Sequence, residues 1–510
     1  MSKKNYLILT TLIVGMCSIM YELLISTVSS YFLGNSIKQF SLIIGVYMAA
    51  MGVGAYLAQF IKGNLLYRFI QIEIVLGLIG ALSVPLLYFY FSVADFSGFN
   101  FFTLSIISFI GILTGLEVPV ITRILESELS LSENISNILA FDYLGALIAT
   151  LAFPFFLLPV VGTFKSSLIF GYLNILVGIL TYIVFSKEIV FKKKKKFVLW
   201  LSFFAISVLI FTCLICSKSI IDRWNNGIFK FPVIYSELSP YQDITLTKTD
   251  QEFRLYLNGA IQFSSKDEYR YHEALIHVPM MQLDQPRKVL LLGGGDGLAV
   301  REILKYASVE SVTVVDLDPA VTRIAKQHAL IYELNKSSLE DERVEVLNQD
   351  AFVFLMNDVS SYDVIISDLP DPTSESLSRL YSNAFYNLVI SRLDYNGIFC
   401  TQATSPELTK NAFWCIDQTM KKSGLTYTYP FRINVPSFGN WGFIIGSLKA
   451  VDMRFDKGIP TQFLEEDSME HIFYFPKDTR VEQVLTNTLD QAILMEYYLE
   501  HWRNLNYEAK

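Results

Sequence analysis

Hydrophobic and polar positions divide the chain into two parts with different patterns. The first 217 residues consist of long apolar stretches, and a helix needs about 20 such residues to cross a bilayer. The first stretch is too long for a cleaved signal peptide, and no small-residue cleavage site follows it. We predict about seven spanning helices, near Leu7–Val28, Phe40–Ile61, Ile70–Val93, Phe101–Val120, Ile138–Val161, Ser166–Phe185 and Phe197–Cys216. Residues 1–217 should therefore form an α-helical polytopic membrane domain.

From Trp224 onward the pattern changes to short strands that alternate with helices. Residues Ile244–Ile261 alternate polar and apolar around Asn258-Gly259, a pair typical of a type I′ hairpin turn. Buried strands are predicted after it at Val289–Leu292, Ser311–Asp316, Val344–Gln349, Tyr362–Asp368 and Gly397–Gln402. Strands and helices at this spacing indicate a doubly wound parallel sheet. We predict a β-hairpin unit over residues 218–285, followed by a Rossmann-like α/β domain over residues 286–510.

Composition supports the membrane prediction and excludes other classes. Hydrophobic residues make up 52% of the chain and charged residues 18%, whereas a soluble chain usually carries about 25% charged residues. The net charge is −8 and no domain is basic, so a nucleic-acid partner is not expected. The five cysteines show neither a disulfide framework nor zinc-ligand spacing, so we predict no metal site.

Several residues of the helical half call for an explanation. Acidic residues are costly in hydrocarbon, so they are either functional, placed at helix ends or hydrogen-bonded between helices. Gly52 and Gly54 predict close helix packing. The acids that lie in or beside the predicted spans are Glu22, Glu73, Glu117 and Asp142.

A glycine-rich loop carries the clearest chemical signal. The strand Val289–Leu292 leads into residues 293–297, Gly-Gly-Gly-Asp-Gly, with a helix predicted near Leu298 and an acid, Asp316, at the end of the next strand. Glycines at such a turn let a ligand approach the backbone, and the acid can accept ribose hydroxyls, so we predict a nucleoside or dinucleotide site. Asp296 would repel a diphosphate, and it would also repel the carboxylate of S-adenosylmethionine. Decarboxylated S-adenosylmethionine, which keeps the ammonium, fits better.

Further motifs resemble the spermidine synthase family in the same order. They are Tyr241–Ile244, Leu257–Gln262, Asp267–Glu273, the glycine loop, Asp316, Asp350 and Asp368–Pro372. The resemblance covers about Ser236 to Ser447. It implies a polyamine aminopropyltransferase that moves the aminopropyl group of decarboxylated S-adenosylmethionine to putrescine or a related amine, giving spermidine and methylthioadenosine. It implies neither a prosthetic group nor a metal.

The resemblance also implies a role for individual residues. Asp371 matches the general base, and Asp296 matches the acid that binds the aminopropyl ammonium. The residues that resemble the nucleoside site are Gln242, Gly293, Gly295, Asp316, Asp350 and Ala351. Those that resemble the acceptor site are Tyr271, His272, Asp296 and Asp368. Structural alternatives are that Asp368 and Asp371 cap a strand end and that His272 is a hydrogen-bonded histidine of the hairpin.

Two segments depart from the family pattern on the acceptor side. The family continues with Gly-Pro after the Asp-Pro-x that contains the catalytic acid, whereas this chain continues Pro372-Thr373-Ser374-Glu375. Pro436-Ser437-Phe438 stands where relatives often have a tyrosine. The identity of the acceptor amine therefore stays open.

Two other functions compete with aminopropyl transfer. One is a methyltransferase that uses S-adenosylmethionine, which Asp296 disfavours. The other is a polyamine transporter or sensor whose C-terminal domain binds without catalysis; the acids in the spans favour it and Asp371 opposes it. Expected partners are a small polyamine and the lipid bilayer, with a homo-oligomer as a further possibility.

Two signals disagree about the orientation of the chain in the cell membrane. With seven spans, the positive-inside rule places the N-terminus inside and the enzyme domain outside. The residues that give this bias are Lys3, Lys4, Lys62, Arg68, Arg123, Lys187 and Lys192–Lys196. The expected donor, however, is a cytosolic metabolite. We expect a multi-pass membrane protein with a cytoplasmic catalytic domain.

Overall fold

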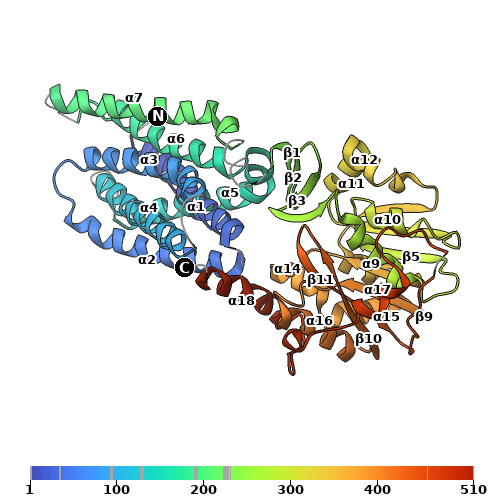
Figure 1. Ribbon diagram of the computed structural model, residues 1–510. Helices are drawn as coiled ribbons and strands as arrows, with labels where there is room; N and C mark the ends of the chain where they lie inside the picture. The colour runs from blue at the N-terminus through green and yellow to red at the C-terminus, as the bar shows by residue number, and fades with distance from the viewer. Residues whose placement is uncertain are drawn as a thin grey trace. The chain divides into compact units, whose positions relative to one another are not determined.

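The computed structural model describes residues 3–33, 36–91, 96–126, 131–188, 193–221, 229, 231–456 and 458–508. The chain divides into two compact units, Met1–Lys230 and Phe231–Lys510. The first unit is helical, and the second contains both β-sheets (Figure 1).

Seven helices of the first unit are long and apolar enough to cross a membrane, counted over the residues that the structure describes. They are α1 (Lys3–Leu33), α2 (Ser36–Leu57), α3 (Leu65–Phe91), α4 (Phe96–Leu125), α5 (Leu131–Ala152), α6 (Thr163–Val184) and α7 (Lys193–Ile215). A short 3-10 turn, η1 (Ala58–Phe60), extends α2, and a π-helical stretch, η2 (Phe153–Val161), extends α5. Each predicted apolar stretch coincides with one helix, although the predicted residues 92 and 93 lie outside the described residues.

The helices pack chiefly in pairs, α3 on α6, α2 on α4 and α1 on α5. A Cβ added at Gly54 would collide with the backbone of Ile112, and one added at Gly115 would collide with the backbone of Met51, so α2 and α4 approach closely at glycines. The prediction for Gly54 is thus confirmed. It is wrong for Gly52, where a Cβ would meet no atom within 4 Å; that glycine does not lie in the helix contact.

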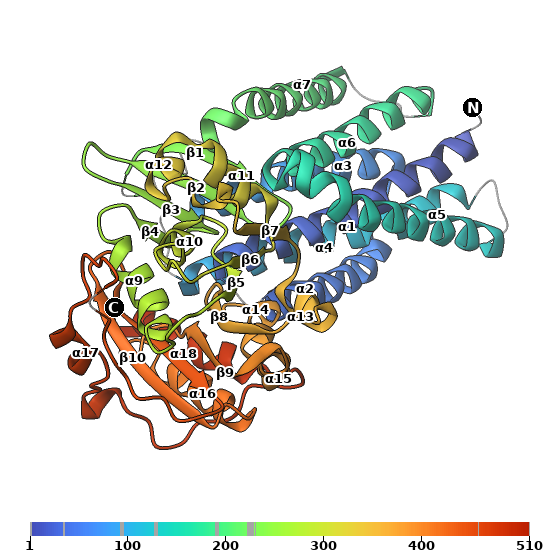
Figure 2. The same cartoon turned by 90° about the vertical axis from the view of Figure 1, so that its right-hand side faces the viewer.

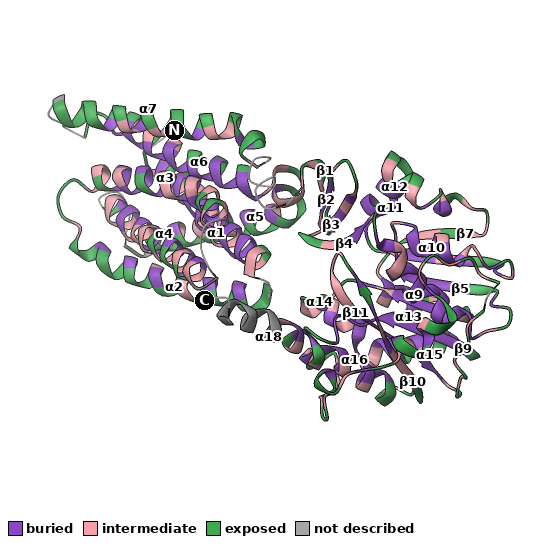
Figure 3. Ribbon diagram, in the orientation of Figure 1, coloured by how far each residue is buried: buried purple, intermediate pink, exposed green. Residues whose placement is uncertain are grey.

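The acids predicted in the spans differ in burial. Glu73 on α3 and Glu117 on α4 are fully buried in the bundle, whereas Glu22 and Asp142 are half-buried. Several large apolar side chains of α7 are exposed, among them Phe197, Phe204 and Phe211. Much of this helix has the colour of exposed residues in Figure 3. The bundle therefore buries two glutamates completely and exposes apolar surface, the reverse of the arrangement expected in water.

The second unit begins with a four-stranded antiparallel sheet of order β1-β2-β3-β4. Its strands are β1 (Val233–Leu238), β2 (Asp243–Lys248), β3 (Phe253–Leu257) and β4 (Ala260–Ser264). Asn258 and Gly259, between β3 and β4, have φ of 51° and 77°, so the predicted turn with two left-handed residues is confirmed. The predicted hairpin is thus half of a larger sheet.

The main sheet has the order β10-β11-β9-β8-β5-β6-β7. Figure 2 labels all of these strands except β11. Its five parallel strands are β5 (Lys288–Gly293), β6 (Ser311–Asp316), β7 (Val344–Asn348), β8 (Tyr362–Asp368) and β9 (Leu393–Gln402). All five were predicted, and only β9 begins clearly earlier than expected. The pair β10 (Tyr427–Val435) and β11 (Gly439–Ser447) is antiparallel and was not predicted.

Side chains of β5 alternate between two cores. Val289 and Leu291 belong to one buried cluster, and Leu290 and Leu292 to another, so both faces of the sheet are covered. The helices of this unit are α9 (Glu268–Met280), α10 (Leu298–Ile303), α11 (Pro319–Gln327), α12 (Ala329–Leu334), α13 (Ala351–Asn357), α14 (Glu375–Ser378), α15 (Asn383–Arg392), α16 (Lys410–Lys422), α17 (Glu466–Ile472) and α18 (Ile493–Glu508). Short 3-10 turns are η3 (Ser338–Glu340), η4 (Arg379–Tyr381) and η5 (Lys477–Thr479).

The order of the sheet reverses next to β5. The chain runs from β5 outward through β6 to β7 and then returns to β8 on the other side of β5. In open parallel sheets, ligands bind at the carboxyl ends of the strands where the order reverses. The ends of β5 and β8 therefore mark where a site is expected.

Candidate active site

The glycine loop directly follows β5. Gly293, Gly294 and Gly297 have φ of 86°, 69° and 82°, which side chains rarely adopt. A Cβ on Gly295 would lie 2.5 Å from Asp316 Oδ2, so this position has room only for glycine. Helix α10 begins at Leu298, as predicted. The loop thus brings bare backbone to the sheet edge, where a ligand can approach it.

Asp316 ends β6 and is tied to this loop. Its Oδ2 accepts the Gly295 N–H at 2.9 Å and its Oδ1 accepts the Asp318 N–H at 2.9 Å. Gln242, from the loop between β1 and β2, donates to Asp318 Oδ2 at 3.1 Å. Burial raises the pKa of Asp316 to about 6, although the two backbone hydrogen bonds act to lower it. Gln242 and Asp316 therefore lie on the same side of the sheet edge, and Asp318, which was not predicted, links them.

Asp350 and Ala351 lie after β7, at the start of α13. Asp350 caps this helix by accepting the N–H groups of Phe352 at 2.9 Å and Val353 at 3.1 Å. Arg379 forms an ion pair with its other oxygen. The Asp350 carboxylate thus has local partners, and its predicted role in nucleoside binding stays a prediction.

The end of β8 carries a second acid beside the glycine loop. Asp368 pairs with Gly293 across β5 and β8, and its Oδ1 accepts the Tyr271 hydroxyl at 2.6 Å. Burial raises the pKa of Asp368 to about 6. The nearby charge of His272 acts to lower this pKa, and that of Asp296 acts to raise it. Burial also raises the pKa of Asp296, whose Oδ1 accepts the Leu298 N–H at 2.9 Å. The structure thus brings Tyr271, His272, Asp296 and Asp368 together.

His272 lies on helix α9, so the hairpin assigned to it as an alternative is wrong. The sequence places it only a few residues after β4, and the helix begins at once at Glu268. Its Nδ1 lies 2.7 Å from Glu268 Oε2. Burial acts to lower the pKa of His272, but the hydrogen bond and charge of Glu268 raise it to about 9. The ring is therefore cationic at neutral pH and adjoins the acids.

Asp371, three residues after Asp368, receives two hydrogen bonds from residues that the sequence did not point to. Gln402 Nε2 donates to Oδ1 at 3.3 Å, and the Tyr498 hydroxyl donates to Oδ2 at 2.9 Å. Gln402 also donates to Tyr381 Oη at 2.6 Å and to Leu369 O at 2.7 Å. Burial raises the pKa of Asp371 to about 6, against the effect of these hydrogen bonds.

Gln402 could have been found from sequence, because it ends a predicted parallel strand. Tyr498 lies on α18, and nothing in its local sequence connects it to Asp371. Asp371 itself does not cap a helix; the hydroxyl of Ser374 accepts the Leu377 N–H and caps α14.

The two segments that depart from the family pattern border the same region. After Asp371, the Thr373 N–H donates to the Asp371 carbonyl at 2.7 Å and forms a tight turn in place of the expected Gly-Pro. Ser437 donates its N–H and hydroxyl to Asp267 at 2.6 and 2.9 Å. Phe438 packs edge-on against Tyr271, with ring centroids 5.9 Å apart. An apolar ring thus lies where the family resemblance led us to expect a tyrosine.

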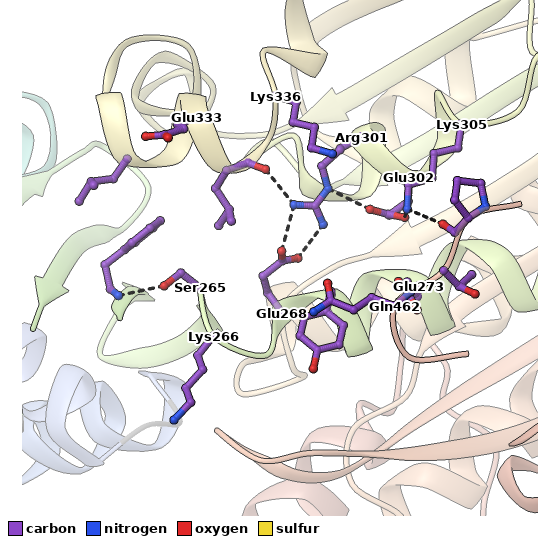
Figure 4. Close-up of a pocket in the computed structure, with 16 residues that line it drawn as sticks. Ser265, Lys266, Glu268, Glu273, Arg301, Glu302, Lys305, Glu333, Lys336 and Gln462 are labelled. Carbon is purple, nitrogen blue, oxygen red and sulfur yellow. Dashed lines mark hydrogen bonds and ion pairs between the residues drawn. The ribbon is translucent and has the colours of Figure 1, made fainter. Parts of the chain in front are cut away.

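A pocket of about 600 Å³ opens beside α10 (Figure 4). Glu268, Arg301, Glu302 and Lys305 are among its lining residues. It is lined by none of the four aspartates 296, 316, 368 and 371, but its lining residue Glu268 contacts His272, which adjoins them. Among the described residues, no group of three or more His, Cys, Asp or Glu side chains is arranged to hold a metal ion.

Comparison with known proteins identifies relatives over the whole chain. A spermine/spermidine synthase domain matches residues 268–457. The chain is 39% identical to a polyamine aminopropyltransferase of Leptospira interrogans, covering 98% of this chain and 99% of that protein. It is 38% identical to a polyamine aminopropyltransferase of Oceanobacillus iheyensis, covering 96% of each. A crystal structure of a spermidine synthase with the transition-state analogue AdoDATO is 28% identical and has a TM-score of 0.45, covering 48% of this chain and 85% of that one.

The raised pKa of Asp368 predicts a stability that depends on pH. The folded chain holds this acid protonated to about pH 6, above its ordinary value of about 3.9, so ionisation at higher pH destabilises the fold. Asp368→Asn should therefore raise the free energy of unfolding at pH 7.5 by on the order of 1–3 kcal/mol, and by much less at pH 5. Scanning calorimetry of the full chain at both pH values tests this, with the exposed Asp394→Asn as control. An equal change at both pH values would contradict it.

Proposed function

The chain belongs to the polyamine aminopropyltransferase family, and on that premise we propose how its own residues carry out aminopropyl transfer. The family uses decarboxylated S-adenosylmethionine as the donor. We assign the acceptor as putrescine or a related diamine, so that the products are spermidine and methylthioadenosine. The methyltransferase and the non-catalytic sensor weighed above are not supported by the relatives, which are aminopropyltransferases over nearly the whole chain.

One observation supports this assignment above the others. Asp296, Asp368 and Asp371 are half-buried and lie on segments that leave neighbouring parallel strands, and Tyr271 binds one of them directly. Carboxylates gathered in a region of low dielectric attract cations strongly. Donor and acceptor both carry amino groups that are protonated at neutral pH, so both suit this arrangement.

The donor side uses the glycine loop. We propose that the nucleoside lies along Gly293 and Gly295 and that Asp316 accepts its ribose hydroxyls. Gln242, with Asp350 and Ala351, would then hold the remainder of the nucleoside. Asp296 would bind the ammonium of the aminopropyl group. A carboxylate on the donor would be placed against Asp296 and repelled, which selects the decarboxylated donor.

The acceptor side uses the neighbouring acids. We propose that Tyr271, His272 and Asp368 orient one amino group of the diamine while Asp371 faces the other. An amine with a pKa of about 10.4 must lose a proton before it can attack. Asp371, with a pKa of about 6, is ionised at neutral pH and can accept it.

The bond changes balance without a metal or a redox group. The neutral amine nitrogen attacks the carbon next to the sulfonium sulfur in line with the bond that breaks. The new C–N bond forms as the C–S bond breaks. The electron pair of the broken C–S bond stays on sulfur. The proton goes to Asp371, and the donor leaves as methylthioadenosine. Holding both reactants in this geometry supplies much of the rate.

The seven apolar helices of the first unit are long enough to cross a membrane. We propose that the seven apolar helices anchor the chain in the cell membrane, with residues 1–217 as the membrane domain. Residues 218–285 would then form the β-hairpin unit of the enzyme, and residues 286–510 would form its Rossmann-like catalytic domain. The buried acids Glu73 and Glu117 and the apolar outer surface support this arrangement. We propose that the catalytic unit faces the cytoplasm, where the donor is made.

The catalytic assignment predicts that Asp371→Asn lowers kcat by about 10²–10⁴-fold, because the amine loses its proton acceptor. Asparagine keeps one oxygen that can accept from Gln402, and its NH2 group can donate to the Tyr498 hydroxyl, so the fold and donor binding should persist. Mass spectrometry of the products of the purified full chain, given decarboxylated donor and a panel of amines, measures this. Asp394→Asn serves as control. More than half of the wild-type turnover in Asp371→Asn would remove this residue from the role, and no aminopropylated amine from the wild type would overturn the proposed function.

The orientation predicts which side of the membrane reacts with an impermeant thiol reagent. Val359 is 88% exposed and lies in the catalytic unit. Val359→Cys, in a chain with Cys213 and Cys216 changed to serine, should react only after intact expressing cells are permeabilised. Labelling of intact cells would place the catalytic unit outside, in agreement with the distribution of positive charge.

A further inference from the structure

Glu268 is a buried carboxylate that connects the acceptor region to the pocket beside α10. It occupies the first turn of α9, one turn before His272, and its side chain is 4% exposed. Its Oε2 lies 2.7 Å from His272 Nδ1, and the backbone carbonyl of Glu268 lies 2.8 Å from the same nitrogen. Both acceptors of Nδ1 therefore come from one residue, which fixes the ring and places the proton on this nitrogen.

Arg301 clamps Glu268 from the opposite side. It donates to Oε1 at 2.9 Å and to Oε2 at 3.0 Å, a two-pronged pair in which both groups are nearly buried. Arg301 is fixed in turn by Glu302 at 2.9 Å and by the Leu334 carbonyl at 2.8 Å. Figure 4 shows the guanidinium between the two glutamates. Because Arg301 lies on α10, which directly follows the glycine loop, the clamp ties α9 to the segment that carries Asp296.

The ion pair between Arg301 and Glu268 favours the charged form of His272. Arg301 stabilises Glu268 as a carboxylate, and a fully ionised Glu268 favours the charged ring. The charged ring in turn acts on Asp296 and Asp368, which lie near it from the glycine loop and from β8. The groups that face His272 are thus Glu268 and Tyr271 of α9, Asp296 before α10 and Asp368 of β8, with Arg301 behind Glu268.

We propose that Glu268, clamped by Arg301, is a positioning residue that holds His272 as an imidazolium beside Asp296 and Asp368, and that this charge keeps the two aspartates ionised and ready for amino groups. The inference rests on the proposed function, since it concerns how the acceptor region is charged before substrates bind. The titration of the cluster supports it. Against burial, Glu268 raises the pKa of His272, and His272 acts to lower the pKa of both aspartates.

The sign of the expected effect follows from these interactions. Glu268→Gln keeps an oxygen that can accept from Nδ1 but removes the charge, so the pKa of His272 falls. The aspartates then lose their neighbouring cation, their pKa values rise, and they ionise only at higher pH. The acid limb of kcat/KM for the amine, which reports the free enzyme, should move upward by about 0.5–1 pH unit. In Glu268→Gln, KM for the amine near pH 6 should differ clearly from the wild-type value. The kcat measured at alkaline pH should stay close to that of the wild type.

The experiment is a double-mutant cycle read as pH profiles of the full chain. Glu268→Gln and His272→Gln should move the acid limb in the same direction, and the double variant should move it no further than His272→Gln alone. Glu302→Gln is the matched control, because Glu302 is equally buried and binds Arg301 without contacting His272. It should lower thermal stability and leave the acid limb in place.

The outcomes separate this inference from the proposed function. An acid limb that does not move in Glu268→Gln, or additive shifts in the double variant, overturns the positioning role while the wild type is active. Glu268→Asp, which keeps the charge on a shorter side chain, should shift the limb partway; if Glu268→Gln does not fold, absence of a shift in Glu268→Asp overturns the role. A wild type without transfer activity fails the proposed function instead.

Discussion

The central constraint on the catalytic unit is the cost of keeping several carboxylates half-buried at one edge of a sheet. Asp316, Asp368 and Asp371 all have a pKa of about 6, because burial disfavours their charged forms. The fold offsets this with backbone N–H groups at Asp316, tyrosine hydroxyls at Asp368 and Asp371, and the cation of His272. These partners leave negative charge in excess, so the site is complementary to ligands that bring positive charge.

The remaining architecture serves to place these groups together. The reversal of strand order beside β5 places the carboxyl ends of β5 and β8 side by side, and left-handed glycines let the backbone turn there without side chains. Helix α9 follows the antiparallel sheet and carries Tyr271 and His272. The Tyr271 hydroxyl donates to Asp368 at this edge. The clamp from Glu268 to Arg301 fixes that helix to α10. The active region therefore depends on contacts between segments far apart in the sequence.

The sequence pattern was enough to predict those elements that depend on neighbouring residues in the chain. The apolar stretches, the Asn258-Gly259 turn and the five parallel strands follow from hydrophobic period and turn chemistry, and the structure contains all of them. The antiparallel pair β10 and β11 was missed. The alternative that placed His272 on the hairpin was wrong, because the turn at residues 265–267 leads directly into α9 at Glu268. Gly52 was assigned to a helix contact that only Gly54 makes, since the sequence does not specify which face of α2 meets α4.

The candidate site shows the same division. Acids at strand ends could be located from sequence, and so could Gln402, which ends a predicted strand, but Tyr498 reaches Asp371 only through tertiary packing. The central claim is that Asp296 selects a donor that has an ammonium and lacks a carboxylate. Asp296→Asn retains the acceptor for the Leu298 N–H and removes only the charge, so calorimetry of the full chain with decarboxylated and ordinary S-adenosylmethionine tests the claim directly. The wild type should strongly prefer the decarboxylated donor and the variant should lose most of that preference, whereas an unchanged ratio of the two affinities would contradict the account.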